Sequence, residues 1–221
     1  MKFDIAKRLP EVDEAIARTE NPRHLAILNN YVRHANLEVS GLWHGIVAPD
    51  MMVEHPIYRF HSPKGLRIID GMQGICDEYA RYANERSSVI YHTEGQVAVN
   101  DDGFMTEYVT HRFWPGSCLR EQGDDIDDPE AIYLVSNTQA MWWPYDEFGR
   151  LREERVYRGA DRTIHKCTPD EVITVEEARE KLLPLTPPVW IIGRPKPDWQ
   201  PGQVVPYPKS LEEARAKAIK L

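Results

Sequence analysis

The strongest constraint on the fold is a pair of extended runs, residues 88–100 and 104–115, joined by Asn100-Asp101-Asp102-Gly103. Both runs are rich in β-branched and aromatic residues, and a junction of Asn, Asp and Gly is typical of a β-hairpin turn. His92 lies near the start of the first run and His111 near the end of the second. Antiparallel pairing across the turn therefore predicts that the two imidazoles lie at the same end of one sheet.

The remaining chain predicts helices first and strands afterwards. Apolar residues at spacings of three and four predict a helix over 22–39, with Asn21 as its N-cap and Pro22 in its first turn. Pro56 lies inside an extended run, which indicates an edge strand or a bulge. The other expected elements are a short helix or arm over 1–20, a helical turn over 42–47, a small hairpin over 51–69, a helix over 72–85, and a second hairpin over 131–143 and 150–157.

This order of elements predicts an α+β fold, in which a strongly curved antiparallel sheet wraps around three helices and leaves a conical cavity. We expect three parts: an N-terminal helical arm (1–21), a cone-shaped catalytic domain (22–165) and a C-terminal extension (166–221). The extension is rich in proline around Trp190 and Trp199. Such a segment seldom folds alone, so we expect it to pack on the domain or on a neighbouring subunit.

Composition limits the partners and the compartment. The formal charge of −8 argues against nucleic-acid and anionic-membrane partners, because both need a basic surface. No apolar run approaches the ~20 residues that span a bilayer, and the first residues lack the apolar stretch of a signal peptide. Cys76, Cys118 and Cys167 form no paired motif. We therefore expect a protein of the reducing cytoplasm.

A set of residues within 22–165 resembles the nuclear-transport-factor-2-like superfamily, and is most similar to its polyketide-cyclase-like, bile-acid dehydratase and scytalone dehydratase branches. The set comprises Tyr31-Val-Arg-His-Ala-Asn36, Ile46-Val-Ala-Pro-Asp50, Tyr58-Arg59, Gly71, His92 and Asp146-Glu-Phe-Gly-Arg-Leu151. The resemblance implies that His92 is a strand-borne base. It also implies that Tyr31, Tyr58 and Arg59 stabilise developing charge or assist the leaving group.

Asn36 departs from the family pattern, because several members carry an aspartate there that supports the histidine. An amide can hold an imidazole by a hydrogen bond but cannot stabilise an imidazolium by charge. The acidic residues that could replace the aspartate are Glu94, Glu107 and Glu54.

His92 also has a physical case of its own, since a histidine with an ordinary pKa near ~6.5 accepts protons at neutral pH. A purely structural histidine in the sheet is the alternative. His111 and Arg112 point to opposite faces of a regular strand, so only one of them can line a cavity. The same rule turns one ring of Trp142-Trp143 inward, where it could stack on an aromatic substrate. Further candidates for substrate binding are Asn36, and His55 and His61 at the cavity mouth.

These residues favour a cofactor-independent lyase that acts on a small hydroxylated, aromatic substrate by general-base elimination. Loss of water and retro-aldol-like loss of formaldehyde, as in the superfamily's lignin-dimer lyases, fit equally well. An isomerase or cyclase and a non-catalytic binding module remain alternatives. Recognised metal motifs are absent from the sequence, although two histidines with Glu94 or Glu107 could form a facial triad. We expect a homodimer or homotrimer, because the outer face of a curved sheet commonly pairs.

Overall fold

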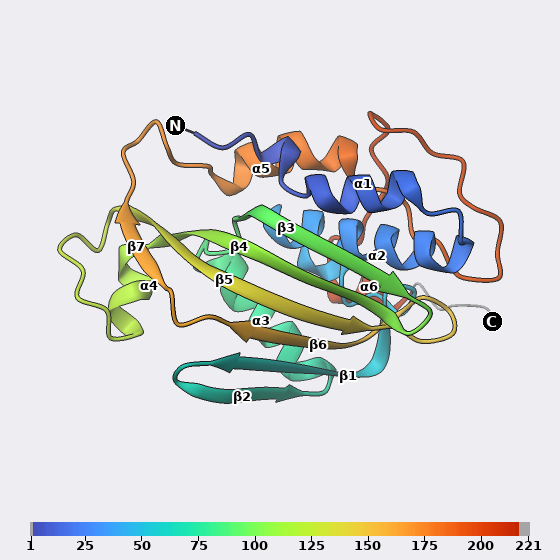
Figure 1. Ribbon diagram of the computed structural model, residues 1–221, viewed down its shortest axis with the longest axis horizontal. Coiled ribbons are helices and arrows are strands. Elements are labelled where there is room, and N and C mark those ends of the chain that lie inside the picture. The colour runs from blue at the N-terminus through green and yellow to red at the C-terminus, as the bar shows by residue number, and fades with distance from the viewer. Residues whose placement is uncertain (1, 217–221) are drawn as a thin grey trace.

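A seven-stranded sheet forms the centre of the computed structural model, which describes residues 2–216 (Figure 1). Six strands follow the order β2-β1-β6-β5-β4-β3, and β7 pairs with β5. Neighbouring strands are antiparallel except β1 and β6, which are parallel. The strands are β1 (Met52–Ser62), β2 (Gly65–Asp70), β3 (Ile90–Asn100), β4 (Gly103–Pro115), β5 (Ile132–Pro144), β6 (Leu151–Arg158) and β7 (Thr163–Lys166).

The two longest helices, α2 and α3, cover one face of this sheet, and α1 and α5 lie along its β3 edge (Figure 1). The α-helices are α1 (Pro10–Arg18), α2 (Pro22–Val39), α3 (Met72–Asn84), α4 (Gly116–Glu121), α5 (Val175–Leu182) and α6 (Leu211–Arg215). Short 3-10 helices are η1 (Ile5–Lys7), η2 (Trp43–Gly45) and η3 (Leu183–Leu185). No helix within residues 2–216 is long and apolar enough to cross a membrane.

The predicted α+β plan with a curved sheet is confirmed. Helix α2 spans the predicted range, and the Asn21 side chain accepts a hydrogen bond from the backbone N–H of Arg23 at 2.9 Å. The strict antiparallel expectation was wrong for β1, which starts beside the start of β6 and so runs in the same direction. Pro56 lies at a bulge between β1 and β6 and not on an edge strand. Helix α4 and strand β7 were not predicted.

The β3–β4 hairpin has the predicted register around its turn, with Asn100 opposite Gly103. Farther along, His92 lies opposite Thr110, and Tyr91 lies opposite His111. Because residues opposite one another share a face, the two histidines are at the same end of the hairpin but on different faces. A bulge at Glu94-Gly95 interrupts β3, where a Cβ on Gly95 would come within 2.3 Å of the Tyr108 ring.

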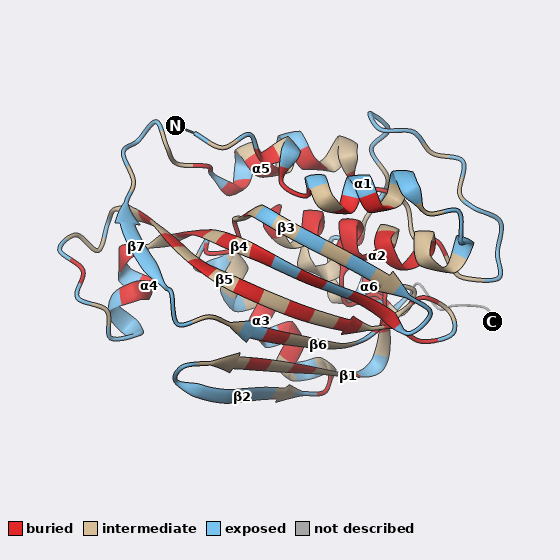
Figure 2. Ribbon diagram, in the orientation of Figure 1, coloured by how far each residue is buried: buried red, intermediate tan, exposed pale blue. Residues whose placement is uncertain are grey.

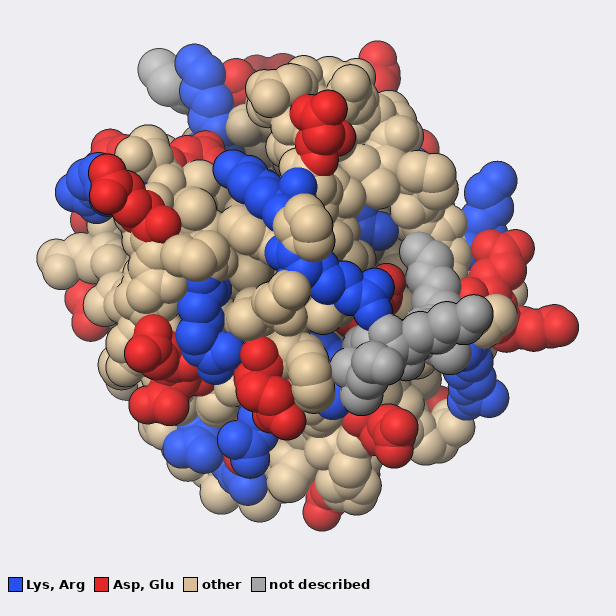
Figure 3. All heavy atoms as spheres, turned by 90° about the vertical axis from the view of Figure 1, so that its right-hand side faces the viewer, with Lys and Arg blue, Asp and Glu red and all other residues tan. Residues whose placement is uncertain are grey.

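The face of the sheet toward α2 and α3 carries the main core. Buried and more exposed positions alternate along β4 and β5 (Figure 2). In the core, Tyr31 on α2 packs against Phe104 on β4 and Trp143 on β5, with ring centroids 4.5 and 5.1 Å away. In the view of Figure 3, acidic and basic side chains are interspersed over the surface, and several basic side chains lie next to one another across its middle.

The C-terminal segment contacts α2 through two buried polar side chains. Nη1 of Arg33 donates to the carbonyl oxygen of Pro187 at 2.9 Å, and Nδ2 of Asn36 donates to that of Leu185 at 3.3 Å. Trp190, in the same segment, is buried as well. The two hydrogen bonds hold residues 185–187 against the helical layer. The three-part division of the chain stays a prediction.

Candidate functional site

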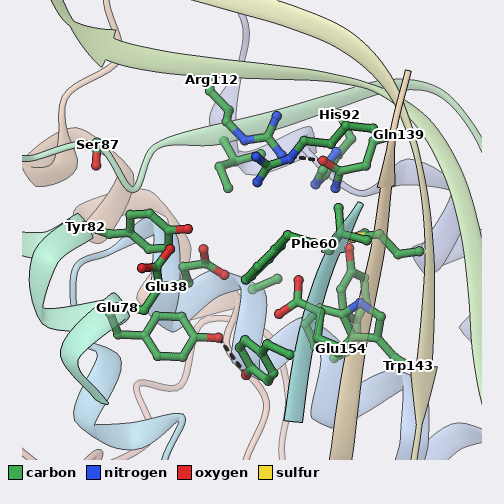
Figure 4. A pocket seen from close by; sticks show the side chains of 18 of the residues that line it. Glu38, Phe60, Glu78, Tyr82, Ser87, His92, Arg112, Gln139, Trp143 and Glu154 are labelled. Atoms are coloured by element: carbon green, nitrogen blue, oxygen red, sulfur yellow. Dashed lines mark hydrogen bonds between the residues drawn. The ribbon is translucent and has the colours of Figure 1, made fainter. Parts of the chain in front are cut away.

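A cavity lies between the concave face of the sheet and helices α2 and α3 (Figure 4). Its volume is about 60 Å³, which is room for several water molecules at ~10–15 Å³ each. Titratable and aromatic side chains dominate its walls: Arg8, Tyr31, Glu38, Tyr58, Phe60, Glu78, Tyr79, Tyr82, His92, Arg112, Trp114, Trp143, Glu154 and Arg158. The sequence-predicted candidates that meet here are His92, Tyr31, Tyr58 and Trp143.

His92 enters the cavity from β3 and is 4% exposed. Its Nδ1 lies 3.3 Å from Oγ1 of Thr110, and its ring stacks on Tyr108 with centroids 4.4 Å apart. Burial, with the nearby guanidinium groups of Arg8 and Arg112, lowers the pKa of His92 well below its usual value. The imidazole is therefore neutral at pH 7. It can exchange hydrogen bonds with a ligand, but the surroundings oppose its protonation.

Tyr58 reaches the cavity from β1 and belongs to a chain of hydrogen-bonded rings. Its hydroxyl lies 2.9 Å from that of Tyr79 on α3, which in turn lies 2.6 Å from Nε2 of His34 on α2. Burial raises the pKa of both tyrosines and, with Arg8, lowers that of His34 to about 3. All three groups are neutral at pH 7. Tyr31 is neutral as well, because burial raises its pKa to about 12.

Two glutamates that sequence reasoning did not select point into the cavity from opposite walls, and the ring of Phe60 lies between them in Figure 4. Glu38 comes from α2, and its carboxylate lies 3.8 Å from Nε2 of His34, which is neutral at pH 7 and so forms no ion pair with it. Burial raises the pKa of Glu38 to about 7. Glu154 comes from β6, and burial together with Glu38 raises its pKa well above the usual value.

Glu78 shows what a paired carboxylate looks like in the same cavity. Arg67 donates to its two carboxylate oxygens at 3.0 and 2.6 Å, and Arg81 adds a third bond at 3.0 Å. Although burial alone would raise its pKa, these bonds lower the pKa of Glu78 to about 2. Glu78 is a permanent anion in an ion-pair network. Glu38 and Glu154 are not.

Three arginines in the cavity walls lack a carboxylate partner within 4 Å among residues 2–216: Arg8, Arg112 and Arg158. Arg112 donates instead to the neutral side chains of Asn137, at 3.3 Å, and Gln139. Burial and the neighbouring Arg158 lower the pKa of Arg112 to about 9. The cavity therefore contains guanidinium groups that no ion pair holds, although Glu38 and Glu154 act on Arg112 at longer range.

The sequence left open whether His111 or Arg112 lines the cavity, and the structure places Arg112 there. His111 lies on the outer face, where Nε2 is 2.9 Å from Oγ1 of Thr93 and Nδ1 is 2.7 Å from Oγ of Ser136. Strand alternation separates Trp143, inside, from Trp142, which is not among the cavity residues. The expectation that His111 and Trp142 bind substrate is therefore not supported.

The other predicted site residues, Arg59, His61, His55 and Asn36, also lie outside the cavity walls. Arg59 alternates with Tyr58 and points to the outer face, where it pairs with Glu153. His61 stacks on Tyr157, with centroids 4.5 Å apart, and His55 is exposed and pairs with Asp70 at 2.6 Å. Asn36 is buried, but its amide is held by Arg8 and Leu185 and does not line the cavity. The acidic candidates Glu54, Glu94 and Glu107 are all exposed.

Residues 2–216 contain no group of three or more His, Cys, Asp or Glu side chains placed to hold a metal ion. The facial triad considered from the sequence has no geometric basis there, because His92 and His111 are on different faces.

A signal for Glu38 was present in the sequence. Tyr31, Ala35 and Glu38 are spaced by four and three, so they share one stripe of α2, and a carboxylate within such a stripe indicates a buried charge.

Comparisons with known proteins give similarity of fold only. No family model matches the sequence, and no curated protein matches it. Among solved structures, a protein from Jannaschia sp. CCS1 assigned as a SnoaL-like polyketide cyclase is 13% identical, with a TM-score of 0.47 over 64% of this chain and 90% of that one. An NTF2-like protein from Anabaena variabilis ATCC 29413 is 12% identical, with a TM-score of 0.48 over 65% and 94%.

A third similar structure is the epoxide hydrolase/cyclase-like enzyme SalBIII of pyran ring formation in the polyether salinomycin. It is 16% identical, with a TM-score of 0.43 over 67% of this chain and 98% of that one.

Proposed function

We propose that this protein is a lyase that eliminates water or formaldehyde from a small hydroxylated, aromatic molecule by proton transfer between its own side chains. The observation that supports this most is the pair Glu38 and Glu154, which face one cavity without an ion-pair partner among its arginines. The pKa of Glu38 is raised to about 7 and that of Glu154 lies well above its usual value. Because Glu38 raises the pKa of Glu154, the two carboxyl groups do not ionise independently, and one can serve as base while the other keeps its proton.

In loss of water, the Glu38 carboxylate removes a proton from the carbon next to the one that bears the hydroxyl group. The electrons of that C–H bond form a C=C bond, and the C–O bond breaks. Protonated Glu154 gives its proton to the departing oxygen, so the products are an alkene and water. Each carboxyl group ends in the opposite protonation state, and exchange with solvent restores both.

Loss of formaldehyde from a 1,3-diol uses the same two groups. Glu38 removes the proton of the terminal hydroxyl, and the adjacent C–C bond breaks as formaldehyde forms. The electrons of that bond form the C=C bond and expel the second hydroxyl, which Glu154 protonates. An aromatic ring on the reacting carbon would delocalise the developing charge. Arg112 and the neutral hydroxyl of Tyr58 are the groups able to stabilise an oxyanion in the cavity.

His92, the base expected from the sequence, has a different part in this proposal. Because its pKa lies well below the usual value, it is a weaker base than Glu38 at neutral pH. A neutral imidazole beside Arg112 suits the orientation of a substrate hydroxyl by a hydrogen bond.

The test begins with a screen of phenolic lignin dimers, hydroxylated polyketides and hydroxylated steroids, followed by mass spectrometry for water or formaldehyde loss. On the substrate found, Glu38→Gln should lower kcat by ~10²–10⁴-fold, the usual contribution of a general base. His92→Gln should lower it by no more than ~10-fold, and the exposed Glu94→Gln is the matched control.

A larger loss of kcat in His92→Gln than in Glu38→Gln would restore His92 as the base and contradict the role given to Glu38. Products of the same mass as the substrate would indicate an isomerase or cyclase and reject the lyase. No conversion, combined with tight binding of screened compounds, would indicate a binding module.

A further inference from the structure

A second pocket of about 260 Å³ adjoins the cavity. It lies beside the turn of the β1–β2 hairpin (62–64), the end of α4 and the segment 159–162 that follows β6. The two spaces share three wall residues, Arg112, Trp114 and Arg158. The inner cavity and this outer pocket are therefore neighbouring compartments that meet at two guanidinium groups and one indole ring.

Arg112 and Arg158, the guanidinium groups at the junction, form no ion pair within residues 2–216. The outer pocket is lined by Lys64, Arg112, Arg158 and Arg162 but by no acidic residue among residues 2–216. Arg162 is neutralised by Asp124, which accepts two bonds at 2.7 Å. Arg112 and Arg158 have no such partner, and Nε of Arg158 is buried without a hydrogen bond.

A buried guanidinium group without an ion-pair partner, such as that of Arg112, is costly unless something else neutralises it, and Arg158 beside it is half-buried. Their planar donors match a carboxylate, to which they can donate two parallel bonds. Glu38 and Glu154 on the inner side would repel a group with two negative charges, so a singly charged carboxylate fits best. Trp114, shared by both spaces, offers an apolar surface for an aromatic ring next to that carboxylate.

We propose that the two pockets form one site for an aromatic carboxylate with two arms. The carboxylate would lie between Arg112 and Arg158, one arm would enter the inner cavity toward Glu38 and Glu154, and the other would lie in the outer pocket beside Trp114. This inference rests on the proposed function and names its substrate class: molecules with two rings and an acid group between them.

Binding can be tested without a known substrate by calorimetry with three probes. 2,3-Diphenylpropanoate has two rings flanking a carboxylate, 3-phenylpropanoate has one ring, and 2,3-diphenylpropanamide lacks the charge. The two-ring acid should bind most tightly. Arg158→Gln should weaken its binding by ~10–100-fold, the scale of a hydrogen bond to a charged group, and leave the amide unchanged.

Two further variants distinguish the contribution of the second ring to binding from that of the arginine charge. Arg155→Gln, on the same strand but on the outer face, is the control for loss of an arginine and should change nothing. Ala160→Trp adds a large ring at an exposed position in the wall of the outer pocket. It should reduce the affinity for the two-ring acid to that for the one-ring acid, whose binding should stay the same.

Equal affinity for the acid and the amide, or an equal effect of Ala160→Trp on both acids, would overturn the two-armed carboxylate site. These outcomes are independent of turnover. Carboxylate binding that depends on Arg158, without elimination of any screened compound, would reject the proposed reaction and keep the site. Turnover of neutral diols that depends on Glu38, with no preference for carboxylates, would do the opposite.

Discussion

The two faces of β6 carry the same kinds of charged residue in opposite circumstances. On the outer face, Glu153 accepts bonds from Arg59 and from Arg155, so the charges are paired and partly in water. On the inner face, Glu154 and Arg158 share a cavity with Arg112 but form no ion pair with it or with each other within 4 Å. Paired surface charges contribute little to stability, whereas unpaired buried ones cost free energy. A cost of this kind is typical of a functional site.

The largest effect is expected when neighbouring glutamates on the two faces are each replaced by glutamine and the two variants are compared. Glu154→Gln removes the proposed proton donor and should lower kcat by ~10²–10⁴-fold on the substrate found by screening. Glu153→Gln, one residue away, should leave kcat unchanged and alter the free energy of unfolding by no more than ~0.5 kcal/mol. Steady-state kinetics and urea unfolding measure the two quantities.

Equal loss of kcat in both variants would mean that the inner face has no special role. A loss in Glu154→Gln alone, with wild-type stability, would confirm that the inner carboxyl group acts in the reaction.

The fold was more predictable than the site because different signals specify them. The Asn100–Gly103 turn and the stripe of α2 are local patterns, and both gave correct elements. Strand β6 has charged residues on both faces, so alternation cannot tell Glu153 from Glu154. Only the pairing of β6 with β5 and β1 decides which face is inside.

The pattern of α2 also did not predict which of its polar residues are buried. The sequence pattern gives no sign that His34 is buried, because a helix exposed on one side has polar positions to spare. In fact His34 is 1% exposed because it lies against Tyr79 of α3 and Trp143 of β5. Another side of α2 is covered by the C-terminal segment, through Arg33 and Asn36. That segment is distant in sequence and has no periodic pattern from which its position could be predicted.

Glu38 and Glu78 allow the same comparison to be made through the pH dependence of stability. Burial without an ion-pair partner raises the pKa of Glu38, whereas two arginine partners lower the pKa of Glu78. The folded-state pKa of Glu38, about 7, lies above the ordinary glutamate value of 4.5. Its contribution to stability is therefore present below pH 4.5 and is lost as the pH rises toward 7. Glu38→Gln abolishes this loss and should stabilise the protein relative to wild type at pH 7, on the order of 2 kcal/mol.

For Glu78 the folded-state pKa, about 2, lies below the ordinary glutamate value of 4.5. Its contribution is present above pH 4.5 and is lost as the pH falls toward 2. Glu78→Gln should thus destabilise the protein at pH 7 by about 2 kcal/mol, the scale of hydrogen bonds to a charged group, and by less at pH 3. Urea unfolding of both variants and wild type between pH 3 and 7.5 measures the trends, and parallel curves would contradict the assigned difference.

The smallest expected effect concerns His111, which lies at the same end of the hairpin as His92 but on the other face. His111→Ala removes hydrogen bonds to Thr93 and Ser136 and should cost about 1 kcal/mol at pH 8. Burial lowers the folded-state pKa of His111, so wild type itself loses part of this contribution as the pH falls below ~6.5, and the cost should shrink at pH 5.5. Because the side chain faces away from the cavity, kcat should stay within ~2-fold of wild type, in contrast to Glu154→Gln. A tenfold loss of kcat in His111→Ala would show that the outer face also acts on the substrate.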